Sequence, residues 1–314
     1  MNRKVVVTGG AGLVGQNLLS RLTARGYTNI VALDKHPTNT ATLQRYNPMV
    51  RVLQRDLAGD DVGANNWSME LAGCHALVIA HAQIGGTDSA EFTRNNIQAT
   101  ERVVEAARRH NVAYVINISS SVVNSMAKDD YTETKKAQEA LVVASGIKQV
   151  VLRPTLMFGW FDRKHLGWLA RFMQKVPVFP IPGSGRFLRQ PLFAGDFCDL
   201  IAASIEKETT GIYNITGQER IDYIDLIRAV KTVTGAKCRI QSIPYRLFAA
   251  MLTINGLIDR NPAFTVKQLE ALTTPDEFEV IDWPTIFAVR ATPLQDALKK
   301  TFQDPVYSKI VLEF

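Results

Sequence analysis

The chain has 314 residues, of which 46% are apolar and 21% charged, and 36 Lys and Arg against 30 Asp and Glu give a net charge of +6. This composition excludes a disordered chain, a collagen-like repeat and a mini-protein that depends on disulfides. The nearest approach to a basic run is the short segment 163–165, so we expect no nucleic-acid partner.

Three cysteines, Cys74, Cys198 and Cys238, lack the spacing of a zinc site, and the five histidines show no metal-ligand spacing either. We therefore expect no metal, and we interpret the cysteines as buried free thiols in a reducing, cytoplasmic location.

No stretch approaches 18 uninterrupted apolar residues, and the apolar run at 5–7 is too short for a signal peptide, so no transmembrane segment is predicted. The most apolar helical candidate is 245–258. We interpret it as core or dimer packing, with peripheral membrane contact as the alternative.

The first half of the chain alternates short β-branched runs with helical patterns. Strands are predicted at 5–7, 30–33, 50–53, 76–80, 114–118 and 149–152, and helices at 15–25, 93–110 and 131–144. Such nearly continuous apolar runs are typical of parallel strands that are buried on both faces. Residues 1–152 are therefore predicted to form an α/β dinucleotide-binding domain with a Rossmann-like, doubly wound parallel sheet.

After residue 153, prolines and glycines interrupt the regular pattern, which predicts a smaller C-terminal substrate lobe. A helix at 193–205 and a strand at 211–215 are expected to return to the sheet. The substrate lobe would thus consist of residues 153–191 and 216–314. Residues from about 192 to 215 would rejoin the dinucleotide-binding domain, so the two parts are interleaved along the chain.

A glycine-rich turn, TGGAGLVG at 8–15, follows the first strand and opens a helix. Gly9 and Gly12 permit a tight turn and close approach of a pyrophosphate, and Gly15 permits close packing of helix on strand. Leu13 and Val14 would lie in the first helical turn, whose N–H groups favour an anion. We predict a dinucleotide cofactor here.

Asp34 ends the second strand, nineteen residues after Gly15. Its carboxylate can accept hydrogen bonds from both ribose hydroxyls and would repel a 2′-phosphate, which favours NAD over NADP; the adjacent Lys35 and His36 weaken that preference. Asp56 and Leu57, after the third strand, are predicted at the adenine edge, with an exposed turn as the structural alternative.

Tyr131 and Lys135 are four residues apart on a predicted helix, so they share one face, and Asp130 with Glu133 would cap its start. A phenol needs a nearby cation to act as an acid–base group near neutral pH, and Lys135 could supply that charge. The serine run 119–121 ends the fifth strand, where a hydroxyl could hold a carbonyl oxygen beside the tyrosine.

Together these residues resemble the extended short-chain dehydrogenase/reductase family, in its NAD-dependent epimerase/dehydratase branch. Weaker matches are AHA at 80–82, NIQAT at 96–100 and LRP at 152–154. The resemblance implies that Tyr131 is the acid–base, that Lys135 holds the nicotinamide ribose and lowers the pKa of Tyr131, and that a serine orients the substrate oxygen. It also implies that Ala80 lies at the cofactor and that the protein is a homodimer.

Alignment of Val123 with the valine of the family's serine motif selects Ser120 as the serine that orients the substrate oxygen. Ser121 is the alternative for this role and is also expected to contact the substrate. Asn124 and Ser125 stand where the family usually has Tyr and Gly. The spacing from Ser120 to Tyr131 is also shorter than in typical sugar-nucleotide epimerases, so the loop over the site must differ.

Gly183-Ser184-Gly185, followed by Arg189, resembles a family stretch whose arginine meets a substrate diphosphate; a structural ion pair is the alternative role. The expected function is therefore NAD-dependent hydride transfer on a nucleotide-diphosphate sugar, as an epimerase or ketoreductase. Leu156 stands where such enzymes usually carry Asn, and 158–161 and 168–172 are rich in aromatic residues. A reductase of a hydrophobic ketone, of hydroxysteroid or dihydroflavonol type, is the alternative, and a non-catalytic NAD-binding subunit is a third.

Overall fold

The computed structural model describes residues 2–258, 266–273 and 279–313. Its centre is a seven-stranded sheet in the order β11-β6-β5-β4-β1-β2-β3, in which every pair of neighbours is parallel. The strands are β1 (Lys4–Thr8), β2 (Ile30–Asp34), β3 (Arg51–Gln54), β4 (Cys74–Ile79), β5 (Tyr114–Ile118), β6 (Gln149–Pro154) and β11 (Gly211–Ile215). The six strands predicted for the first half are confirmed, each within two residues at its ends, and so is the doubly wound α/β fold.

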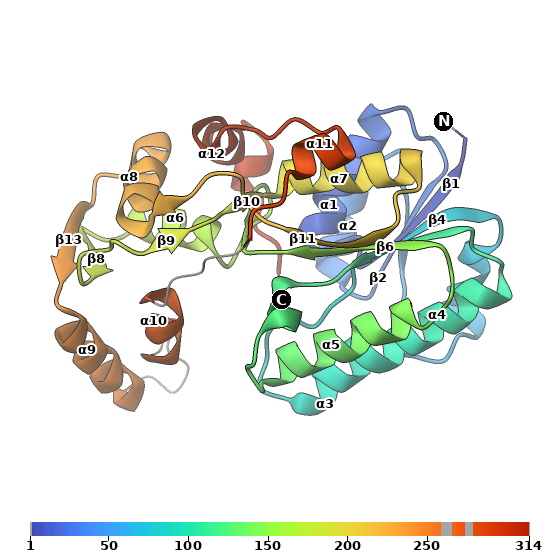
Figure 1. Ribbon diagram of the computed structural model, residues 1–314, viewed down its shortest axis with the longest axis horizontal. Helices are drawn as coiled ribbons and strands as arrows, with labels where there is room; N and C mark the ends of the chain where they lie inside the picture. The colour runs from blue at the N-terminus through green and yellow to red at the C-terminus, as the bar shows by residue number, and fades with distance from the viewer. Residues whose placement is uncertain (1, 259–265, 274–278, 314) are drawn as a thin grey trace.

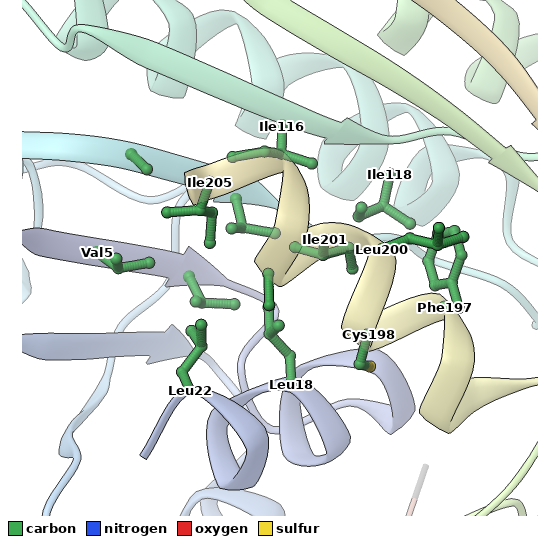
Figure 2. Packing of buried hydrophobic residues seen from close by; sticks show 14 of the residues in the cluster. Val5, Leu18, Leu22, Ile116, Ile118, Phe197, Cys198, Leu200, Ile201 and Ile205 are labelled. Carbon is green, nitrogen blue, oxygen red and sulfur yellow. The ribbon is translucent and has the colours of Figure 1, made fainter. Parts of the chain in front are cut away.

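Helices cover both faces of this sheet (Figure 1). On one face lie α1 (Leu13–Ala24), α2 (Pro37–Tyr46) and α7 (Ala194–Lys207), and on the other α3 (Ser89–Phe92), α4 (Ala99–Arg109) and α5 (Asp130–Val143). Alternate residues of β1 enter opposite cores, since Val5 and Val7 pack in one cluster and Val6 in the other. In Figure 2, side chains of α1, β5 and α7 converge, Leu18, Ile116 and Ile201 among them.

The strand order reverses between β1 and β4. The chain adds β2 and β3 on one side of β1 and then crosses to place β4 on the other side. In open α/β sheets, ligands bind at the carboxyl ends of the strands where the order reverses. The ends of β1 and β4 therefore locate the site.

The predicted return to the sheet is present. Strand β11 pairs in parallel with β6, and α7 packs on α1. The remaining elements are α6 (Leu166–Met173), β8 (Val178–Pro182), α8 (Tyr223–Thr234), β13 (Arg239–Ile243), α9 (Tyr245–Ile258), α10 (Val266–Thr273), α11 (Trp283–Phe287) and α12 (Leu294–Phe302), with two-residue strands β7 (Met157–Phe158), β9 (Leu188–Arg189), β10 (Leu192–Phe193) and β12 (Ile221–Asp222). Most of them share a third apolar cluster, around Phe179, Ile227 and Leu298. The exact division into a dinucleotide domain and a substrate lobe stays a prediction.

Two predicted helix starts need correction. The N-cap of α5 is Asp129, not Asp130: its backbone is extended, and its carboxylate accepts from the N–H of Thr132 at 2.9 Å. Asp130 instead accepts from the Ser89 hydroxyl at 2.7 Å, and Glu133 pairs with Lys136 rather than closing a capping box. The helix predicted at 93–110 begins as a π-helical turn, Thr93–Gln98, and continues as α4.

All three cysteines are buried and free. In the part of the chain that the structure describes, no helix is both long enough and apolar enough to span a bilayer. The 245–258 helix is present as α9, and the side chains of Leu257 and Ile258 lie outside the described residues.

Candidate active site

The glycine turn connects β1 to α1 with the geometry that the sequence predicts. Gly9 has φ +65°, and a Cβ there would lie 2.6 Å from the backbone N and Cα of His81, which follows β4. A Cβ on Gly15 would lie 2.3 Å from the carbonyl oxygen of Gly10. Glycine is therefore required at both positions for the turn to pack against the end of β4 and against the helix.

The N-terminus of α1 has room for an anion. Gly12 occupies the N-cap without a side-chain cap, and a Cβ there would contact only the Gly9 carbonyl oxygen, at 3.3 Å. The N–H groups of the first turn, those of Leu13, Val14 and Gly15, have no intrahelical acceptor, because helical hydrogen bonds begin four residues on. These donors and the helix dipole fit a dinucleotide pyrophosphate.

Asp34 lies at the end of β2 beside this turn. One carboxylate oxygen accepts from the Ala11 N–H and the other from the His36 N–H, both at 3.0 Å. Burial raises the pKa of this carboxyl above its ordinary value, while those two N–H groups lower it. Each oxygen keeps a second lone pair for a ribose hydroxyl.

The two cationic side chains next to Asp34 are engaged elsewhere. Lys35 Nζ donates to Asn95 Oδ1 at 3.0 Å, and the His36 ring caps α2 by accepting from the Asn39 N–H at 3.3 Å. These hydrogen bonds hold Lys35 and His36 on other residues, although His36 still acts electrostatically on Asp34, and the residues fit NAD.

Asp56 and Leu57 follow β3 as predicted. Leu57 is buried, and Asp56 forms an ion pair with Arg94 of the π-helical turn at 2.5 Å and accepts from the Ala58 N–H at 3.1 Å. Burial raises the pKa of Asp56, but Arg94, the Ala58 N–H and the charge of Lys35 together outweigh it, so the pKa lies below the ordinary value. An adenine amino group at this edge would share Asp56 with Arg94, a contact that the sequence did not indicate.

A hydrogen-bonded chain links the glycine turn to Lys135. His81, which follows Ala80, bridges Thr8 Oγ1 (2.8 Å from Nδ1) and Thr100 Oγ1 (3.0 Å from Nε2). Gln138 donates to Thr100 Oγ1 at 3.0 Å, and its Oε1 accepts from Lys135 Nζ. Every group is satisfied when His81 is neutral with its proton on Nδ1, and burial together with the charge of Lys135 lowers its pKa to about 3.

Tyr131 stands in the first turn of α5 and meets Ser120. Burial raises the pKa of Tyr131, the nearby Ser120 hydroxyl lowers it, and the charge of Asp129 raises it. Ser119 is engaged elsewhere, because its hydroxyl donates to Glu139 at 2.5 Å. Ser121 begins a 3₁₀ turn and is half-buried. Among the three serines, Ser120 is the one that the structure brings to the phenol.

Lys135 lies one turn after Tyr131, with only 2% of its surface exposed. Its Nζ donates to the Ile118 carbonyl at 3.0 Å and to Gln138 Oε1. Burial lowers its pKa to about 7, against the opposing effect of Glu139. The groups that act on Tyr131 in this structure are Ser120 and Asp129, so the expected effect of Lys135 on the tyrosine stays a prediction for the cofactor-bound protein.

Glu139 and Arg153 form a partly buried ion pair that sequence reasoning missed. Arg153 Nε donates to Glu139 at 3.0 Å, and its Nη1 donates to Asn124 Oδ1 at 3.1 Å. Because Glu139 also accepts from Ser119, this pair ties the ends of β5 and β6 to α5. The only sequence signal was the LRP triplet, which contains Arg153.

Arg189 lies outside the hydrogen-bonded chain, in the second lobe. It is buried, its guanidinium stacks on Phe187 at 5.1 Å from the ring centroid, and its Nη1 donates to the Leu188 carbonyl. Asp196, which follows it in the same motif, accepts instead from the N–H and hydroxyl of Thr292, at 2.8 and 2.6 Å.

Exposed apolar side chains stand on the loops that follow β4, β5 and β6, at the carboxyl edge of the sheet. Ile84 follows β4, Met126 lies between Ser120 and α5, and Leu156 follows β6. Lys164 of the second lobe donates to the Ile84 carbonyl at 3.3 Å, so the lobe contacts the loop after β4. Within residues 2–258, 266–273 and 279–313, no group of three or more His, Cys, Asp or Glu could hold a metal ion.

Comparison with known proteins places these features in a family context. The model of the NAD-dependent epimerase/dehydratase family matches residues 5–216. A farnesyl-dihydroquinoline-oxide ketoreductase from Stigmatella aurantiaca is 25% identical over 77% of this chain and 77% of its own, and a ceramide reductase from Caulobacter vibrioides is 23% identical over 81% and 77%. The crystal structure of a UDP-glucuronic acid 4-epimerase from Bacillus cereus with NAD is similar over 96% of this chain and 97% of that one, with a TM-score of 0.71 and 20% identity.

Proposed function

The chain belongs to the NAD-dependent epimerase/dehydratase family and is an enzyme of that family; we propose that it transfers hydride at a carbinol or ketone carbon, with Ser120, Tyr131 and Lys135 as its catalytic residues. The observation that carries the proposal is that the Ser120 hydroxyl acts on the Tyr131 phenol at the carboxyl edge of the sheet, with Lys135 one helical turn on.

Bound NAD supplies the acceptor for hydride during oxidation of the substrate. Tyr131 removes the hydroxyl proton as the C–H bond breaks, and in the reverse direction it returns that proton to the carbonyl oxygen. Ser120 donates a hydrogen bond to the same oxygen and limits the charge that develops there. Lys135 holds positive charge near the phenol, which favours the phenolate that the first step requires.

The cofactor residues proposed from the sequence remain those of the glycine turn and the strand ends: Gly9, Gly12, Leu13, Val14, Gly15, Asp34, Asp56, Leu57 and Ala80, with Lys135 at the nicotinamide ribose. The uncapped N-terminus of α1 and the lone pairs of Asp34 support the first six. The contact of Gly9 with the chain after Ala80 supports a site where the order of strands reverses.

For the substrate, the first candidate is a nucleotide-diphosphate sugar, with Ser121 and Arg189 as binding residues. Arg189 supports it, because a guanidinium held by stacking on Phe187 is a group of the kind that binds phosphate. In a titration with UDP in the presence of NAD, Arg189→Met is expected to weaken binding at least tenfold. Arg186→Met is the matched control, because Arg186 is exposed and paired with Asp222 and Asp225.

A second candidate is a ketone or alcohol with an apolar body. Ile84, Met126 and Leu156 support it, because they expose apolar surface on the loops that follow β4, β5 and β6, at the carboxyl edge of the sheet. The two reductases named above, which act on a farnesylated quinoline derivative and on ceramide by their names, support it as well.

A thermal-unfolding panel separates the two candidates. With saturating NAD present, a ligand at 100 times its Kd adds about 2.7 kcal/mol to the free energy of unfolding. Stabilisation by UDP or UDP-sugars supports the first candidate, and stabilisation by a steroid or sphingoid ketone without any effect of UDP supports the second. If neither class acts while NAD does, both substrate proposals are wrong.

The predicted homodimer through α4 and α5 remains a proposal, as does the cytoplasmic location. Light scattering of the purified chain tests the dimer: a mass near 70 kDa is expected, twice the 34.9 kDa of one chain, and a single-chain mass contradicts it.

A further inference from the structure

The outer end of the second lobe carries an unusual combination of apolar and basic surface. Strand β13, helix α9 and the neighbouring end of α8 lie together at the end of the molecule farthest from the seven-stranded sheet (Figure 1). None of the residues that we assign to catalysis or to the cofactor lies in these elements. We refer to this surface, from α8 through α9, as the distal surface.

Helix α9 presents an apolar face to solvent. Leu247, Met251 and Ile254 are each between 51 and 58% exposed, and their spacing of four and three residues places them on one side of the helix. Phe248, beside this row, is buried. An exposed row of this kind is expected where a helix contacts a partner or a lipid interface.

Basic residues outnumber acidic residues around this helix. Between Asp225 and Asp259 the sequence contains no Asp or Glu but has five Lys and Arg, namely Arg228, Lys231, Lys237, Arg239 and Arg246. Arg228 pairs with Asp225 at 2.8 Å, which leaves the other four without an acidic residue in their own segment. Lys237, Arg239 and Arg246 are exposed, and α10, which packs on α9, adds one exposed acidic residue, Glu270.

A hollow of about 510 Å³ opens between α8 and β13 on the same surface. Lys231 and Arg228 line it together with the hydroxyls of Thr232 and Ser242 and the amide of Gln241. Ammonium, guanidinium and hydroxyl donors are the groups that bind phosphate oxygens.

We propose that the distal surface docks on an anionic lipid bilayer, with Leu247, Met251 and Ile254 in the headgroup region and the basic residues against lipid phosphates. Basic side chains beside an exposed apolar helix face match such an interface in both polarity and sign. A second copy of the chain fits less well, because a twofold contact would set these cations against their own equivalents. The proposal holds whichever substrate the enzyme uses.

Vesicle flotation tests the docking without any measurement of turnover. The wild-type chain is mixed with phosphatidylcholine vesicles and with vesicles that contain 30% phosphatidylglycerol, in low and in high salt. We expect binding to the anionic vesicles, weak binding to the neutral ones, and release at high salt because the contact is partly electrostatic.

Two variants locate the contact. Lys237→Gln with Arg239→Gln is expected to lower the partition coefficient about 30-fold, about fivefold for each cation. The matched control is Arg102→Gln with Arg109→Gln on α4, which removes the same charge from another surface and should bind like wild type.

Leu247→Ser with Met251→Ser is expected to lower binding at least tenfold, and Val62→Ser, an exposed apolar position elsewhere, should not. Thermal unfolding and NAD binding equal to wild type verify that each variant is folded.

Three results would overturn the proposal. One is a wild-type chain that does not bind anionic vesicles, and another is binding that the distal variants leave unchanged. The third is a dimer that Leu247→Ser with Met251→Ser converts to a monomer while vesicle binding persists, because a second copy would then cover α9.

Discussion

Gly9→Ala is expected to damage both the fold and the cofactor site. At φ +65° any residue with a Cβ pays about 1–2 kcal/mol. The new Cβ would lie 2.6 Å from backbone atoms of His81, whereas ordinary contacts begin at 3.4 Å, so the turn and the end of β4 must separate by about 0.8 Å. Both segments are fixed by the parallel sheet, and overpacking of this kind costs about 1–3 kcal/mol. The expected loss in free energy of unfolding is thus about 2–5 kcal/mol.

The same displacement moves the N–H groups that face the pyrophosphate. Loss of one hydrogen bond to a charged group costs about 1.5–3 kcal/mol, which corresponds to a Kd for NAD about 10- to 200-fold weaker. Isothermal titration with NAD and urea unfolding of the same preparation measure the two effects. Gly26→Ala is the control, because Gly26 also has positive φ, +81°, but no heavy atom lies within 4 Å of its added Cβ. Gly26→Ala should therefore lose only the free energy of unfolding that a Cβ at positive φ costs, and it should bind NAD like wild type. An unchanged NAD affinity in Gly9→Ala, or an equal loss in Gly26→Ala, would refute the assignment of the turn.

Three further predictions concern the two serines and the hydrogen-bonded chain of side chains that includes His81 and Lys135. Ser120→Ala should lower kcat about 100-fold with NAD affinity intact, whereas Ser121→Ala should lower it less than tenfold; equal effects in steady-state assays would contradict the choice of Ser120. The pKa of Lys135 is about 7 in the folded protein and near 10.5 in the unfolded chain. Between pH 7 and 10.5 the unfolded chain therefore binds more protons than the folded protein, and the free energy of unfolding rises with pH. The free energy of unfolding of wild type should therefore rise by about 2 kcal/mol relative to Lys135→Met from pH 7.5 to 9, whereas Lys136→Met should follow wild type. The pKa of His81 is about 3 in the folded protein, against an ordinary value of 6.5, so the folded protein becomes less stable as the pH falls below 6.5. In urea titrations, the free energy of unfolding of wild type should therefore fall by about 2 kcal/mol relative to His81→Gln between pH 6.5 and 5. Parallel curves for the two proteins would show that His81 is not held neutral.

The sheet was predictable from sequence because its strands are buried on both faces. In Val5-Val6-Val7, each side chain enters an apolar core on one face of the sheet or the other, so every position is apolar and the strand appears as a continuous apolar run. Helix α2 was not predicted, since its stretch from Pro37 to Tyr46 is mostly polar and packs with few apolar residues, Leu43 chief among them. Its place in the fold depends on tertiary contacts that periodicity does not record.

The candidate site was predictable where chemistry depends on neighbours in sequence. Tyr131 and Lys135 share a helix, and the glycine turn is contiguous. Contacts between distant segments left no such pattern: Gln138 meets His81 only because α5 packs against the end of β4, and Glu139 of α5 meets Arg153 at the end of β6. The choice between adjacent aspartates as the N-cap of α5 likewise depended on a tertiary contact with Ser89.

The most direct test of the proposed chemistry is the rate of hydride transfer in Tyr131→Phe, followed by NADH absorbance with the ligand that the unfolding panel identifies. The substitution removes one hydroxyl and keeps the ring, so NAD should bind within about twofold of wild type while the rate falls by about 100- to 10,000-fold. A rate near that of wild type would contradict the role of Tyr131 as the acid–base group.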